Sequence, residues 1–80
     1  MPAIKTKELE QLLFQREYER IVLKRIHSLF YMIIHVSDGT SLLHYNKEGR
    51  PKEYRYAEQA KEWLERKFGI VEVEVELGAH

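Results

Sequence analysis

The chain has 80 residues, the size of one small domain, and its 13 basic and 13 acidic side chains give a formal net charge of zero. Apolar residues make up 44% and charged residues 32%, which is typical of a soluble globular protein and excludes a disordered chain. The absence of cysteine excludes a disulfide-stabilised fold and a cysteine-based zinc or redox site. The longest apolar run, Leu29–Ile34, is too short to cross a membrane, and no export signal is recognisable, so we expect a cytoplasmic protein.

The first predicted element is a helix over Thr6–Arg16, which follows a loose tail at residues 1–5. Leu9, Leu12 and Leu13 recur at the spacing of one helical face. The threonine at the start has the side chain of an N-cap residue, and glutamates in the first turn favour the positive end of the helix dipole. We therefore expect one helix with a single apolar stripe.

Three strands are predicted next, over Arg20–Ile26, Leu29–Val36 and Ser41–Asn46. The first is ambiguous, because a continued helix would also account for it. We interpret it as a strand because it is rich in β-branched residues and alternates in polarity. A tight turn at His27-Ser28 and a two-residue type I′ turn at Asp38-Gly39 would join the three strands into an antiparallel meander.

The second half of the chain predicts a helix over Ala57–Phe68, with Gly69 as its left-handed C-cap. A brief pairing of Tyr54–Tyr56 would precede this helix. Val71–Leu77 alternates between apolar and acidic residues, which predicts a strand, followed by a loose tail at residues 78–80. We expect a single α+β domain over all 80 residues, in the order α-β-β-β-α-β, with an antiparallel meander, two helices and a C-terminal strand joining the sheet.

The two predicted turns set the strand register. Leu23 would lie opposite Met32, and Ile34 opposite Leu43. One sheet face would then form the core under the second helix. The other face would be an interaction face that includes Tyr31, Ile33, His35, Leu42 and His44. Either the first helix or a second copy of the chain would cover it, and the sequence leaves both open.

A basic and aromatic segment follows the third strand. Cations neutralise phosphates and aromatic rings stack on unpaired bases, so this segment is a candidate contact for nucleic acid. Two glutamates dilute its charge, and a solvated turn with packed tyrosines is the competing interpretation. The candidate residues are Lys47, Arg50, Lys52, Arg55, Tyr54 and Tyr56.

Other chemistry has little support in the sequence. On the predicted register His35 and His44 share a face, but two histidines alone make an incomplete metal site. The serines fall in or beside turns, and no nucleotide-loop, nucleophile-elbow or zinc-protease motif occurs. We therefore expect no catalytic residue, no metal site and no cofactor.

Three stretches carry a resemblance to a known group: Tyr18–Leu23, Asn46–Tyr56 and Glu62–Ile70. They resemble small, mostly uncharacterised bacterial proteins, some of them labelled as associated with plasmid replication or mobile elements. The resemblance implies a bacterial cytoplasmic protein with a compact α+β fold. It supplies no catalytic residue.

The function expected from the sequence is a small non-enzymatic binding or interaction module, with self-association as one form of it. A nucleic-acid-binding accessory protein that uses residues 44–56 is the alternative, and a small enzyme or metal site at the sheet histidines is a remote one. The acidic side of the last strand, with Glu72, Glu74 and Glu76, would protect a sheet edge or dock a basic surface such as that of another copy.

Overall fold

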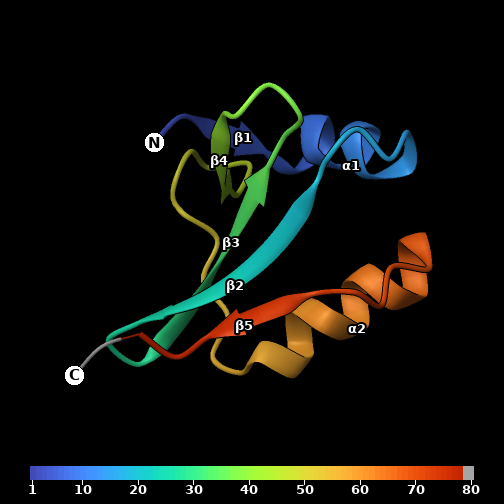
Figure 1. Ribbon diagram of the computed structural model, residues 1–80. Helices are drawn as coiled ribbons and strands as arrows, with labels where there is room; N and C mark the ends of the chain where they lie inside the picture. The colour runs from blue at the N-terminus through green and yellow to red at the C-terminus, as the bar shows by residue number, and fades with distance from the viewer. Residues whose placement is uncertain (79–80) are drawn as a thin grey trace.

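The computed structural model describes residues 1–78 (Figure 1). These residues form a small α+β domain with two helices and a five-stranded mixed sheet. No helix among them is long and apolar enough to cross a membrane. In chain order the elements are β1 (Ala3–Lys5), α1 (Thr6–Phe14), β2 (Arg20–Ile26), β3 (Leu29–His35), β4 (Ser41–Tyr45), α2 (Ala57–Phe68) and β5 (Glu74–Glu76).

The sheet has the strand order β1-β4-β3-β2-β5. The antiparallel meander of β2, β3 and β4 is confirmed, but β1 and β5 pair in parallel with β4 and β2, so the sheet is mixed. The prediction of a loose tail at residues 1–5 was wrong, because Ala3–Lys5 fills the open edge of β4, where the Leu43 amide donates to the Pro2 carbonyl. The end of the tail predicted at 78–80 lies outside the described residues.

The segment Arg20–Ile26 is a strand, as predicted, and pairs along its full length with β3. Leu23 lies opposite Met32, in the predicted register, because the tight turn has its expected two residues. The first of these, His27, has a φ of +61°. Such a left-handed conformation is uncommon outside glycine, asparagine and aspartate, but it suits the right-handed twist of a short hairpin.

The register between β3 and β4 differs from the prediction by one residue, since Ile34 lies opposite Leu42 rather than Leu43. The loop contains three residues, with Gly39 at φ +91° in the last position, and the amide of Val36 donates to the carbonyl of Thr40. This is the geometry of a type I turn followed by a left-handed residue. The Asp-Gly pair was therefore assigned to the wrong turn type.

A register shift of one residue exchanges the faces of a strand. Leu42 and His44 therefore lie on the helix-covered face, not on the predicted interaction face. Leu43 and Tyr45 take their place on the other side of the sheet, next to Ile33. The prediction that His35 and His44 share a face was wrong for the same reason.

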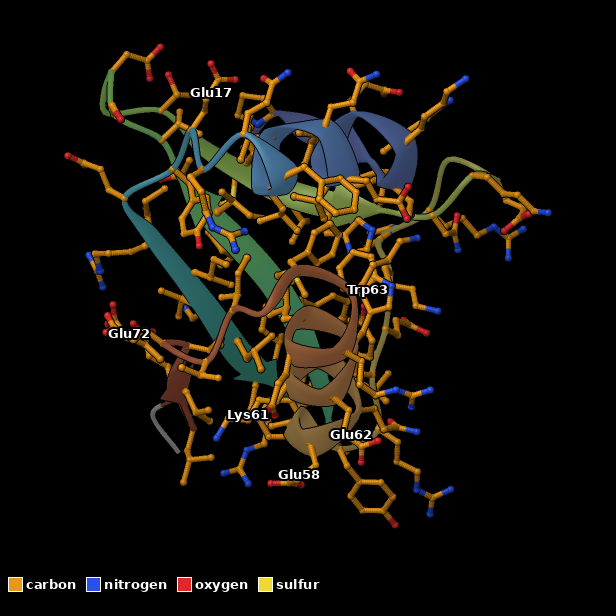
Figure 2. The ribbon with its side chains drawn as sticks, turned by 90° about the vertical axis from the view of Figure 1, so that its right-hand side faces the viewer. Glu17, Glu58, Lys61, Glu62, Trp63 and Glu72 are labelled. Carbon is orange, nitrogen blue, oxygen red and sulfur yellow. The ribbon has the colours of Figure 1, made fainter. Side chains whose placement is uncertain are left out.

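Both helices pack on the same face of the sheet, and in Figure 2 both lie in front of it. Leu9 and Leu13 of α1 and Ala60 and Leu64 of α2 are fully buried there. The first helix therefore does not cover the second face, which was one of the two options that the sequence left open. The core residues are Leu9, Leu13, Ile21, Leu23, Met32, Ile34, Tyr54, Ala57, Ala60, Leu64, Phe68 and Ile70.

The two helices differ in how closely their ends agree with the prediction. Helix α2 has its predicted bounds, and Gly69 at φ +71° is its left-handed C-cap. Helix α1 ends before its predicted limit, because Arg16 adopts a φ of +58°. The Arg16 guanidinium donates to the carbonyl of Leu13 at 2.7 Å and to that of Phe68, so one side chain ties together the last turns of both helices.

Candidate functional site

The first candidate site is the sheet face that no helix covers, which we call the open face. A central apolar row crosses it, with Val22 on β2, Ile33 on β3 and Leu43 on β4 in register. Val22 and Ile33 are only 2% and 8% exposed, although no helix of the described residues packs on this face. Of the predicted interaction residues, Tyr31, Ile33 and His35 belong to this face.

Charge on the open face differs between its two edges. Lys5 is on β1 at one edge, whereas Glu74 and Glu76 are on β5 at the other. Arg20 donates two hydrogen bonds to Glu74, at 2.7 and 2.9 Å, and this pairing lowers the pKa of Glu74. The third glutamate of the predicted acidic row, Glu72, is exposed before the strand begins.

The second candidate site lies on the helix side, beside the loop that follows β4. The side-chain oxygen of Asn46 accepts hydrogen bonds from the backbone amides of Glu48 and Arg50, and Gly49 at φ +84° completes the turn. The loop repeats the geometry of the one at Gly39, since the amide of Asn46 donates to the carbonyl of Arg50. These hydrogen bonds define the backbone turn that carries Lys47.

His44 forms the inner wall of this second site and is 2% exposed. Its Nε2 lies 2.8 Å from the Thr6 hydroxyl, and its ring stacks on the indole of Trp63. Burial lowers its pKa to about 4, with a further contribution from the charge of Lys52. The imidazole is therefore neutral near pH 7, and its buried Nδ1 has no hydrogen-bond partner among the described residues.

Trp63 and Thr6 were not among the residues predicted for a site. Trp63 fits the apolar stripe of α2, so helical spacing alone marks it as a core residue. Figure 2 shows it on the side of α2 nearer to α1, while Glu58, Lys61 and Glu62 lie on the outer surface of that helix. Only the observed register of β4 brings His44 against it.

The structure divides the predicted basic and aromatic set into three groups. Lys47, Lys52 and Tyr54 line the same pocket as His44 and Trp63. Arg50 lines an adjoining hollow that also includes Lys52. Arg55 and Tyr56 lie at the start of α2, with the guanidinium 5.8 Å from the ring centroid.

Tyr54 and Lys52 line the pocket together. The Lys52 ammonium lies 5.4 Å from the centroid of the Tyr54 ring, a cation–π contact. Tyr54 is 9% exposed, and burial raises the pKa of its hydroxyl to about 12. Its ring therefore acts as a packed, neutral wall.

The histidines do not combine into a metal site. The His35 Nδ1 lies 2.7 Å from the Ser41 hydroxyl on the open face, whereas His44 lies on the opposite side of the sheet. Among residues 1–78 no group of three or more side chains is placed to hold a metal ion. The remote metal-site alternative required His35 and His44 on one face of the sheet, and the structure places them on opposite faces.

Comparisons with protein-family models, with curated proteins and with solved structures found no match. The resemblance to small bacterial proteins therefore stays a prediction from sequence. The open face and the pocket beside Trp63 are the two features of the structure that bear on function.

Proposed function

We propose that this chain is a non-enzymatic binding module that self-associates through its open face. The observation that carries the proposal is the placement of both helices on one side of the sheet, so that no helix of the described residues packs against the apolar row on the other side. Sheets with one uncovered face commonly pack against another layer. The partner is a second copy of the chain, because Lys5 at one edge of the sheet is complementary in charge to Glu76 at the other.

The geometry of such a pair follows from the strand order. Because β3 is the middle strand, a two-fold axis along it exchanges β1 with β5 and β4 with β2. Leu43 of one copy then faces Val22 of the other. A second row crosses the open face from Lys5 through Tyr45, Tyr31 and Lys24 to Glu76, if the β3–β4 register is continued to Tyr31 and Tyr45. The two-fold axis exchanges the ends of this row, so Lys5 of each copy meets Glu76 of its partner.

The pair is expected to be weak and salt-sensitive. Val22 and Ile33 are already shielded within one copy, so little apolar area remains to be buried. Charge complementarity then contributes a large share, and exposed charges are screened over about 10 Å at moderate ionic strength. The module would therefore dimerise reversibly as its concentration rises.

Sedimentation equilibrium over a range of protein concentrations, at low and at high salt, tests this proposal. Lys5→Glu and Glu76→Lys should each weaken the dimer, and the double variant should restore it, because the exchanged charges attract again. Lys61→Glu, on the outer surface of α2, is the matched control for the charge change. A chain that stays monomeric at all concentrations, or a double variant weaker than both single ones, would overturn the proposal.

The nucleic-acid alternative stays a prediction with a narrower basis. Lys47, Arg50 and Lys52 gather around one loop, but Arg55 and Tyr56 are placed separately at the start of α2. If that loop contacts nucleic acid, reversing the charges of Arg50 and Lys52 together should abolish nucleic-acid binding. A nucleic-acid affinity that changes neither in this double variant nor with salt concentration would eliminate the alternative.

A further inference from the structure

The pocket beside Trp63 has the size and lining of a small-molecule site. Its volume is about 520 Å³, within the usual range for such sites. It lies between α2 and the loop after β4, on the helix side of the sheet, so it is separate from the open face. Its lining includes His44, Asn46, Lys47, Lys52, Gln59 and Trp63.

The polar groups of this pocket are mostly hydrogen-bond donors, although the Glu48 carboxylate also lines it. The Asn46 oxygen is engaged by two backbone amides, and the Gln59 oxygen accepts from the amides of Arg55 and Tyr56. Both side chains are therefore left with their NH₂ groups to offer. Lys47 and Lys52 add two ammonium groups, and among residues 1–78 neither has a carboxylate within 4.0 Å.

A neighbouring hollow that also includes Gln59 and Trp63 lacks this character. It is larger, at about 640 Å³, but its charges are largely paired. Arg66 lies 3.9 Å from Glu62, and Lys67 lies 2.5 Å from Glu10. An anionic ligand would have to displace these carboxylates, whereas Lys47 and Lys52 form no ion pair within the described part of the chain.

His44 lines this pocket and not the neighbouring hollow. Its Nδ1 is buried and has no hydrogen-bond partner among residues 1–78, and leaving a buried polar atom unpaired is unfavourable. Its ring also holds the indole of Trp63 in place by stacking. Because His44 and Trp63 both line the pocket, a ligand that enters it would lie beside this imidazole and a flat aromatic wall.

We propose that this pocket binds a nucleotide, with the base against Trp63 and the phosphate between Lys47 and Lys52. A base that carries carbonyl oxygens, such as uracil, provides the acceptors that the Asn46 and Gln59 NH₂ groups require. Phosphate is the acceptor-rich anion that paired ammonium groups bind. The nucleotide is either free or part of a single strand, and both sources present the same chemistry.

The single tryptophan of the chain is in this pocket, so its fluorescence reports binding directly. Titration with UMP should give a saturable change, and uridine, which lacks the phosphate, should bind about tenfold more weakly or worse. Lys52→Gln should weaken UMP binding by about tenfold, while the control Lys61→Gln leaves it unchanged. Absence of any saturable change with UMP, equal affinity for uridine, or equal loss in both variants would overturn the proposal.

The side-chain nitrogen resonances of His44 give a second readout. The Nδ1 signal should move on addition of UMP, which loose attraction of phosphate to surface lysines would not produce. An unmoved signal at saturating UMP would overturn the placement in this pocket. Titration with a short oligouridylate then distinguishes the two sources of the nucleotide. Much tighter binding than that of UMP would indicate that the pocket binds single-stranded nucleic acid. Equal affinity per nucleotide would indicate that it binds the free nucleotide.

Discussion

The imidazole of His44 lies nearly parallel to the indole of Trp63, with ring centroids 5.9 Å apart and 11° between the planes. Trp63 meets Phe68 edge-on at 5.1 Å, and Phe68 meets the ring of Phe14 at 4.6 Å. Four rings thus form a continuous row from β4 through α2 to the end of α1. This row connects the pocket to the packing of both helices.

The stability of the fold should fall on acidification through His44. Burial lowers its pKa from 6.5 to about 4, so between these values the unfolded chain binds the proton more tightly than the folded one. The stabilisation is fully present above pH 6.5 and is lost as the pH falls toward 4. From this shift the loss is about 3 kcal/mol. Urea unfolding at a series of pH values measures it.

His44→Gln should flatten the pH dependence in that interval, whatever its effect on stability at neutral pH. His27→Asn is the matched control, because His27 is exposed in a turn and asparagine tolerates its positive φ. A direct NMR titration of His44 in the unaltered chain is independent of any folding defect. A midpoint near 6.5 for that ring would contradict the prediction.

Ile34→Val should lower the free energy of unfolding by about 1 kcal/mol. Ile34 is fully buried, and the removed methylene leaves a small cavity that the core does not refill. Ile26→Val makes the same chemical change at a side chain that is 45% exposed, and it should cost less than about 0.5 kcal/mol. Chemical denaturation of the two variants gives the comparison, and equal losses would argue against the described core.

Gly39→Ala should destabilise the chain by about 1 kcal/mol. An added Cβ would meet no atom within 4 Å, so the cost comes from the backbone, which has a φ of +91°. Ser37→Ala in the same exposed loop keeps an ordinary conformation and should be nearly neutral. Thermal unfolding of both variants is sufficient, and an unaffected Gly39→Ala would mean that the loop has another turn type.

Gln59→Ala should cost about 1 kcal/mol through the start of α2. The Gln59 side chain reaches back to accept hydrogen bonds from the amides of Arg55 and Tyr56, both at 3.1 Å, and alanine leaves these donors to water. Gln11→Ala, on the exposed side of α1, controls for helix propensity. The helical signal of α2 in NMR should fray at its first turn only in Gln59→Ala.

Local patterns were sufficient for much of the fold. Ala57–Phe68 has a clear helical period and a glycine stop, and its predicted bounds agree with the structure. The β2–β3 register also followed from the short turn between them. The β3–β4 register did not, because Asp-Gly suits both a two-residue turn and a three-residue loop, and only the conformation of Gly39 distinguishes them.

The remaining errors concern contacts between distant segments. Ala3–Lys5 has no strand pattern of its own and becomes a strand only because β4 offers an edge. Val71–Leu77 alternates between apolar and acidic residues throughout. Only Glu74–Glu76 pairs with β2, because only these three residues lie alongside that strand. Trp63 and Lys52 were each interpretable from sequence, but their meeting around His44 depends on the register that the turn signal misassigned.

The two edge strands bear on the order in which the sheet assembles. The meander of β2, β3 and β4 joins segments that are neighbours in the chain, so its loops close at small entropic cost. β1 and β5 instead pair with strands from the opposite half of the chain. We therefore expect the meander to form first, and β1 and β5 to be the first strands to exchange their amide hydrogens.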